Sequence, residues 1–145
     1  MKARVLIVAI VAALTVGLGA PAGAGADLFG FAGNVKGGGK ISFQVRTSNH
    51  GNVVRRLKFK DVTATCEGAS GQLSVNIFGS APIDSHREFH VVGEGGGSHS
   101  RVAGRFRASG ARANGTVRLY GMFNDGHGGQ VRCNTGLVEW GAKLT

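Results

Sequence analysis

Apolar and polar side chains alternate with a period of two residues along most of this 145-residue chain, and most clearly over residues 131–144. In that stretch Val138, Trp140, Ala142 and Leu144 share one parity, and polar or small residues occupy much of the other. Successive side chains of an extended strand leave opposite faces of the backbone. The alternation therefore predicts a strand with one buried face.

Six earlier segments follow the same rule and are separated by turns rich in glycine, asparagine and serine. We expect these strands at residues 40–47, 53–66, 72–78, 86–92, 101–108 and 116–123. The alternation changes phase near Lys60 and Asp61, which predicts a β-bulge there. Asn114-Gly115 is interpreted as part of a hairpin turn, and Thr135-Gly136 as a kink in the closing stretch.

The N-terminal segment has the features of a secretory signal peptide. Lys2 and Arg4 precede an apolar run over residues 5–18, and Ala24-Gly25-Ala26 offers a cleavage site between small residues. We therefore expect residues 1–26 to be removed and the protein to be secreted, either to the exterior or into the cell envelope. The alternative is a retained anchor, but a membrane span needs about twenty apolar residues, and glycines and a proline interrupt this run. No transmembrane anchor is expected after processing.

The remaining chain is expected to hold one domain. Residues 27–39 end in three consecutive glycines and are interpreted as a flexible lead-in to a domain over residues 40–145. Loss of Lys2 and Arg4 would lower the net charge from +9 to +7. A basic surface of this kind favours anionic partners.

The chain contains two cysteines, Cys66 and Cys133. Exported proteins commonly oxidise such a pair, and the alternation around each cysteine turns both side chains inward. We expect a single disulfide between them. A redox or nucleophilic thiol is the alternative, but neither cysteine has a Cys-x-x-Cys partner or a neighbouring histidine.

These features predict an all-β, antiparallel fold. After residue 26 no segment shows the 3.6-residue apolar stripe of a helix, and about seven to nine short strands at this spacing are typical of sandwiches and barrels. We expect a β-sandwich, because a disulfide between distant strands commonly joins two sheets. An up-and-down β-barrel is the alternative.

The order of several motifs resembles a group of small secreted all-β bacterial domains of unknown function. These domains close on a Cys-x-Thr-Gly-x-x-x-(aromatic)-x-Ala signature, which matches Cys133 to Ala142 with Trp140 as the aromatic residue. The other motifs lie at residues 39–45, 57–59, 104–106 and 113–118. The resemblance covers nearly all of the chain after the signal peptide. It implies a secreted all-β domain and implies no activity.

Basic residues gather at outward positions of several predicted strands. The candidate ligand-binding residues are Arg56, Lys58, Lys60, Arg105, Arg107, Arg118 and Tyr120. Like charges on one sheet face are destabilising unless an anion or solvent relieves them, and an aromatic ring among them could stack a sugar or a base. We expect an anionic polysaccharide or cell-envelope polymer as partner. A solvated face that keeps the domain soluble is the alternative.

A second candidate site is the sequence His86-Arg87-Glu88-Phe89-His90. On a strand, His86, Glu88 and His90 would share one face, and two imidazoles with a carboxylate are a familiar ligand set for zinc or copper. The outer two would be about 13 Å apart at the backbone, so another ligand, His99 or His127, would have to complete the site. The alternative is a solvated strand face.

Signatures of catalysis are missing from the sequence. There is no Gly-x-Ser-x-Gly motif and no closely spaced carboxylate pair of the kind that glycosidases use. We therefore expect an exported, non-catalytic domain without a cofactor. A metal-binding protein or metalloenzyme, and a passive interaction module, remain as alternatives.

Overall fold

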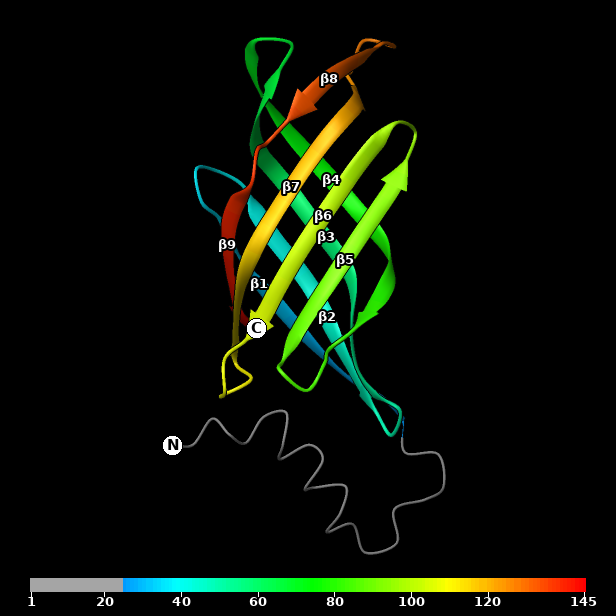
Figure 1. Ribbon diagram of the computed structural model, residues 1–145, viewed down its shortest axis with the longest axis vertical. Helices are drawn as coiled ribbons and strands as arrows, with labels where there is room; N and C mark the ends of the chain where they lie inside the picture. The colour runs from blue at the N-terminus through cyan, green and yellow to red at the C-terminus, as the bar shows by residue number, and fades with distance from the viewer. Residues whose placement is uncertain (1–24) are drawn as a thin grey trace, which may run out of the picture.

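The computed structural model describes residues 25–145, so the predicted signal peptide lies almost entirely outside the described residues. Within them the chain forms nine β-strands (Figure 1), and no helix is long and apolar enough to cross a membrane. The strands are β1 Asp27–Val35, β2 Lys40–Ser48, β3 Gly51–Cys66, β4 Ala69–Pro82, β5 Glu88–Gly95, β6 Ser98–Phe106, β7 Arg112–Asn124, β8 Gln130–Asn134 and β9 Val138–Leu144.

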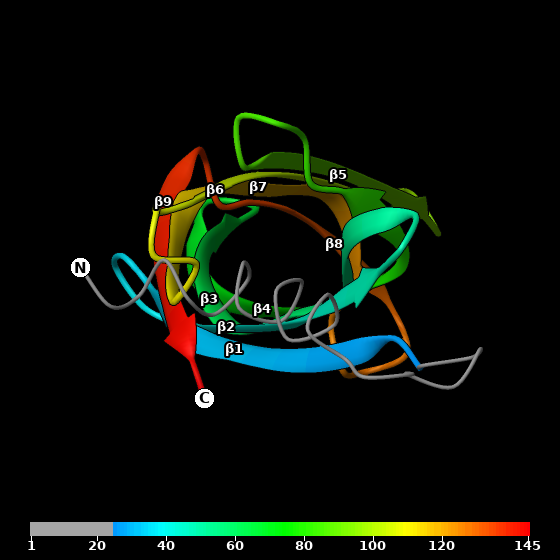
Figure 2. The same cartoon turned by 90° about the horizontal axis from the view of Figure 1, so that it is seen from below.

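All nine strands belong to one antiparallel sheet that curls into a partial ring (Figure 2). The order around the ring is β4-β3-β2-β1-β9-β7-β6-β5. At one end β8 bridges β7 and the last two residues of β3. Strands β4 and β5 are the two ends of the order and share no ladder, so the ring stays open along this one seam.

The interior of the ring is filled by the inward residues of each strand. An aromatic cluster lies at its centre, where the ring of Phe43 has four other aromatic centroids within 5.1 to 6.1 Å. These neighbours are Phe31, Phe89, Phe106 and Trp140. The indole N–H of Trp140 donates a hydrogen bond to the carbonyl of Thr116 (3.1 Å), which satisfies a polar group that burial would otherwise leave without a partner.

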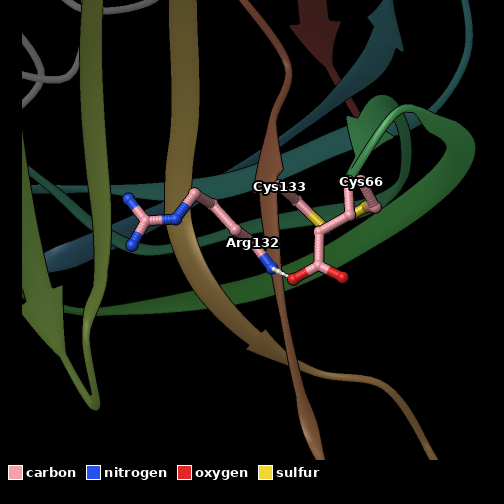
Figure 3. Close-up of a disulfide and its surroundings, with 4 residues drawn as sticks. Cys66, Arg132 and Cys133 are labelled. Carbon is pink, nitrogen blue, oxygen red and sulfur yellow. Dashed lines mark hydrogen bonds between the residues drawn. A yellow bond between two sulfur atoms is a disulfide. The ribbon is translucent and has the colours of Figure 1, made fainter.

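The disulfide is the one that the sequence predicted (Figure 3). Cys66, at the end of β3, lies directly opposite Cys133 of β8, with 4.0 Å between the Cα atoms. The next residues continue the contact: the Glu67 N–H donates to the carbonyl of Arg132 (3.0 Å), and the Arg132 N–H donates to Oε1 of Glu67 (3.3 Å). The bond therefore fixes β8 to β3 and holds this end of the ring together.

The all-β antiparallel fold with one disulfide is confirmed, but the strands do not form the two stacked sheets expected of a sandwich. They form a single curled sheet, which is closer to the barrel alternative. The sandwich was expected on the premise that the disulfide joins two sheets, but it joins β3 to β8, a strand of the same sheet. It fixes one end of the ring and does not connect two layers.

The expected flexible lead-in is corrected for residues 27–35, which form β1 between β2 and β9. Phe31 and Val35 of this strand are buried in the core. Its glycines permit close strand packing, because a Cβ on Gly33 would overlap the carbonyl oxygen of Gly141 on β9. Glycine content here reflects a crowded sheet and not a loose chain.

Asn114-Gly115 is not a turn, as the sequence analysis expected, but part of β7, where the two residues pair with Arg105 and Gly104 of β6. A Cβ on Gly115 would overlap the carbonyl oxygen of Ala103, so this glycine also serves close approach of two strands. The predicted bulge at Lys60–Asp61 is confirmed by a register shift between β3 and β4.

Candidate anion-binding site

Six basic side chains lie on the outer surface of β2 and β3. The alternation places them there, because Ile41, Phe43 and Val45 of β2 point into the core and leave their neighbours outside. We call the six residues the β2–β3 basic face: Lys40, Arg46, Arg55, Arg56, Lys58 and Lys60. Strand pairing brings them close together, since Lys40 is in register with Lys60, and Gln44 with Arg55.

A bulge sets the spacing of the guanidinium groups on this face. Relative to β2, strand β3 has one extra residue between Arg55 and Lys58. The φ of Arg56, 51°, lies in the left-handed region that few residues with a side chain adopt. Because of this insertion, both Arg55 and Lys58 remain outside while Val54 and Leu57 remain buried. Opposite Arg56, strand β4 contributes Phe78 and Gly79. The bulge therefore keeps Arg55, Arg56 and Lys58 on the outer surface within four consecutive residues.

Two adjoining grooves run across the basic face, of about 550 and 450 Å³, and both are lined by Lys58 and Asn76. The larger groove reaches Arg46, Arg55, Arg56 and Phe78, and the smaller one reaches Lys40, Lys60, Ser42 and Ser74. Together they contain all six cations of the basic face.

None of these six cations forms an ion pair within the described residues, where the three pairs are Lys36–Glu139, His99–Glu94 and Arg105–Glu88. The nearest acidic residue in sequence is Asp61 at the second bulge, and its backbone N–H donates a hydrogen bond to the hydroxyl oxygen of Ser74 (3.0 Å). The face therefore has six cations that form no ion pair among the described residues, together with polar side chains that can donate or accept hydrogen bonds.

The other predicted ligand-binding residues lie elsewhere. Arg105 belongs to β6, Arg118 and Tyr120 belong to β7, and Arg107 lies in the turn between these strands. In the ring these strands lie on the opposite side from β2 and β3 (Figure 2). The structure thus brings together Arg56, Lys58 and Lys60 of the predicted set but does not bring the remaining four to them.

Three of these four residues, Arg105, Arg118 and Tyr120, also have interaction partners within the protein. Nε of Arg105 is 3.8 Å from Oε1 of Glu88, and Nε of Arg118 donates to the side chain of Asn134 (3.5 Å). The Tyr120 ring, proposed to stack a sugar or base, already has His99 stacked on it, with 5.0 Å between centroids, and the Arg118 guanidinium 4.8 Å from its centroid. Less of the ring is therefore free for a ligand.

The structure does not bring His86, Glu88 and His90 together as the ligands of one metal ion. His86 lies in the turn before β5 and not on the strand, and its backbone N–H donates to Oδ1 of Asp84 (2.8 Å). Glu88 is directed towards Arg105. Among residues 25–145 no three His, Cys, Asp or Glu side chains are placed to hold one ion, and this includes His90, His99 and His127.

Asp84 organises the turn that carries His86. Its carboxylate accepts hydrogen bonds from the N–H groups of Glu88 (2.9 Å) and His86 (2.8 Å). The hydrogen bond from Glu88 foremost, then that from His86 and the charges of the nearby His86 and His90 imidazoles, lower the pKa of Asp84 below its ordinary 3.8, while desolvation opposes the shift. The acid therefore caps a turn.

The sequence analysis missed Lys40, Arg46 and Arg55 as members of the basic face. Lys40 and Arg46 share the outward parity of the first predicted strand, so the signal was present. Arg55 has inward parity relative to Lys58 in a regular strand, and only the bulge at Arg56 turns it outward.

Comparisons with protein-family models, with curated protein sequences and with solved structures found no significant match to this chain. What the chain does is therefore inferred from its own residues.

Proposed function

We propose that this protein is an exported, non-catalytic domain that binds a polyanionic component of the cell envelope through the β2–β3 basic face. The observation that supports this most directly is the gathering of six cations on two adjoining grooves without an acidic partner. Charges of one sign on neighbouring strands repel each other, and a bound anion removes that cost.

The arrangement suits a repeating anion. Lys58 and Lys60 are about 6.6 Å apart along β3, and Lys40 lies beside Lys60 on the neighbouring strand. Arg55 and Arg56 extend the row in the other direction along β3. An extended polymer with a charge on each repeat can contact several of these groups at once, and each contact releases counterions.

The test is retention on immobilised dextran sulfate in a salt gradient. A triple variant, Arg55→Gln, Lys58→Gln and Lys60→Gln, is expected to elute at clearly lower salt than the unchanged protein. The slope of log affinity against log salt should fall by about one for each lost contact.

The matched control removes three cations from the opposite side of the ring: Arg101→Gln, Arg107→Gln and Arg112→Gln. It has the same net charge as the first variant and keeps the basic face. Under the proposal it stays close to the unchanged protein. Equal losses for the two triple variants would show that net charge alone governs retention, and the proposal would then fail.

A further inference from the structure

The most exposed large apolar side chain of the described residues borders the basic face. Phe78 of β4 is 90% exposed and lines the larger groove together with Arg55 and Arg56. Its two neighbours in sequence explain the position: Ile77 is buried in the core, and Gly79, with φ of 110°, completes the bulge opposite Arg56. Bulges commonly re-aim a side chain, and here the outcome is a phenyl ring directed at solvent.

This exposure contributes little to folding. Transfer of a phenylalanine side chain from water to an apolar environment is favourable, and the exposed Phe78 gains little of that free energy on folding. The other phenylalanines of β2, β3, β5 and β6 are fully buried: Phe43, Phe59, Phe89 and Phe106. The contrast indicates that the ring of Phe78 is free to contact an apolar partner outside the protein.

A second exposed apolar residue lies on the far margin of the same face. Leu28 of β1 is 53% exposed and is in register with Arg46 of β2. The row continues through Val53 of β3 to Pro82 of β4. Phe78 is four residues from Pro82 on β4, so Leu28 and Phe78 are separated by about three strand spacings, or 14 Å, across the sheet and are also offset along the strands. The cations lie between these two apolar side chains.

We infer that the basic face docks on an anionic lipid surface, with Phe78 and Leu28 entering the interface and Arg46, Arg55, Arg56 and Lys58 contacting the headgroup phosphates. This rests on the proposed function and names what presents the anion. Aromatic and aliphatic side chains beside cations are the composition that binds anionic bilayers, because burial of the apolar groups adds to the electrostatic attraction. A soluble polyanion offers the charge but no apolar phase for Phe78.

The test is co-sedimentation with vesicles of equimolar phosphatidylcholine and phosphatidylglycerol, compared with vesicles of phosphatidylcholine alone. The unchanged protein is expected to bind the anionic vesicles only. Phe78→Ala is expected to weaken that binding about ten-fold, since partial burial of the ring is worth roughly one decade of affinity. Leu28→Ala should weaken it several-fold. Leu28→Ala, which lines neither groove, should keep its retention on dextran sulfate.

Val92→Ala and Leu137→Ala are matched controls, because these residues are 66% and 71% exposed but line neither groove. Both should bind vesicles like the unchanged protein. Every variant has the same N-terminal segment, so differences between variants report on the substituted positions. Circular dichroism confirms that each is folded.

Three results would overturn the lipid assignment while leaving the proposed function in place. One is dextran sulfate binding that depends on Lys58 and its neighbours but no binding to anionic vesicles. Another is vesicle binding that Phe78→Ala leaves unchanged. The third is vesicle binding that all four alanine variants reduce equally. A triple cation variant that keeps full retention on dextran sulfate would instead reject the proposed function itself.

Discussion

Gly93 of β5 lies against Ile77 of β4, and a Cβ on this glycine would sit 3.2 Å from Cγ2 of Ile77. The contact crosses the only seam of the ring without a ladder between neighbouring strands of residues 25–145. Side-chain packing therefore replaces backbone hydrogen bonds at this point. The absence of a side chain at residue 93 is what lets β5 approach β4.

Replacement of Gly93 by valine is expected to lower the free energy of unfolding by about 1–3 kcal/mol, because the added methyl groups overfill the seam. Urea denaturation measures the change. Gly95→Val is the control on the same strand, since a Cβ there meets nothing within 4 Å, and it should change stability by no more than about 0.5 kcal/mol. Similar losses at both positions would mean that strand flexibility, and not the contact with Ile77, is what glycine provides.

Gly104→Ala is expected to destabilise the core, because the new methyl group would overlap the ring of Phe89 and lie 2.7 Å from Cζ2 of Trp140. Overpacking of this kind costs about 1–3 kcal/mol. Combining it with Phe89→Leu should recover part of the loss relative to the sum of the single changes, as measured by a double-mutant cycle. Gly141→Ala, where no atom lies within 4 Å, is the control. Strict additivity of the two core changes would contradict the assigned contact.

Replacement of Cys66 and Cys133 together by alanine is expected to cost about 4 kcal/mol, since the disulfide closes a loop with a sequence separation of 67 residues. The loss should be largest at the end of the ring, where β8 is fixed to β3. Hydrogen exchange should therefore speed up at the amides of Glu67 and Arg132 before it does so in the aromatic core. If the unchanged protein lost no stability in reductant, the disulfide would not be contributing.

The turn before β5 is expected to loosen in acid. The pKa of Asp84 is lowered in the folded state, so its stabilising effect is complete above the unfolded-state value near 3.8 and is lost as pH falls through the lower folded-state value. Amide exchange at His86 and Glu88, followed across this range, should report the loss. Asp84→Asn retains an oxygen acceptor but no titrating group. Its exchange rates should lack this step, and an unchanged step would assign the effect to another acid.

The sequence was sufficient to predict most of the individual strands and which of their faces is buried. The inward parity of Leu73, Val75 and Ile77, and that of Val102, Gly104 and Phe106, agree with the buried faces of β4 and β6. Period-two patterning is a local property, because every side chain on one face of a strand meets the same core. Local reasoning gave the wrong prediction at β1 and at Asn114-Gly115. Glycines there suggested loops, but they allow neighbouring strands to pack closely.

Only part of the candidate site could be predicted from the alternation of side chains. Lys58 and Lys60 could be placed on one outer face from parity alone. Their separation from Arg105 and Arg118 could not be foreseen, because parity says which face a residue occupies but not which side of the ring its strand joins.

The sequence by itself determined the all-β class, the buried faces and the pairing of the two cysteines, because each depends on residue type and alternation over a few positions. Only the tertiary structure decided that one sheet curls around the core, and that Arg55, Arg56 and Lys58 share a surface with Phe78. Those relationships depend on strand order, and on bulges that shift a side chain from one face to the other. Both arise from contacts between residues that are distant in the chain.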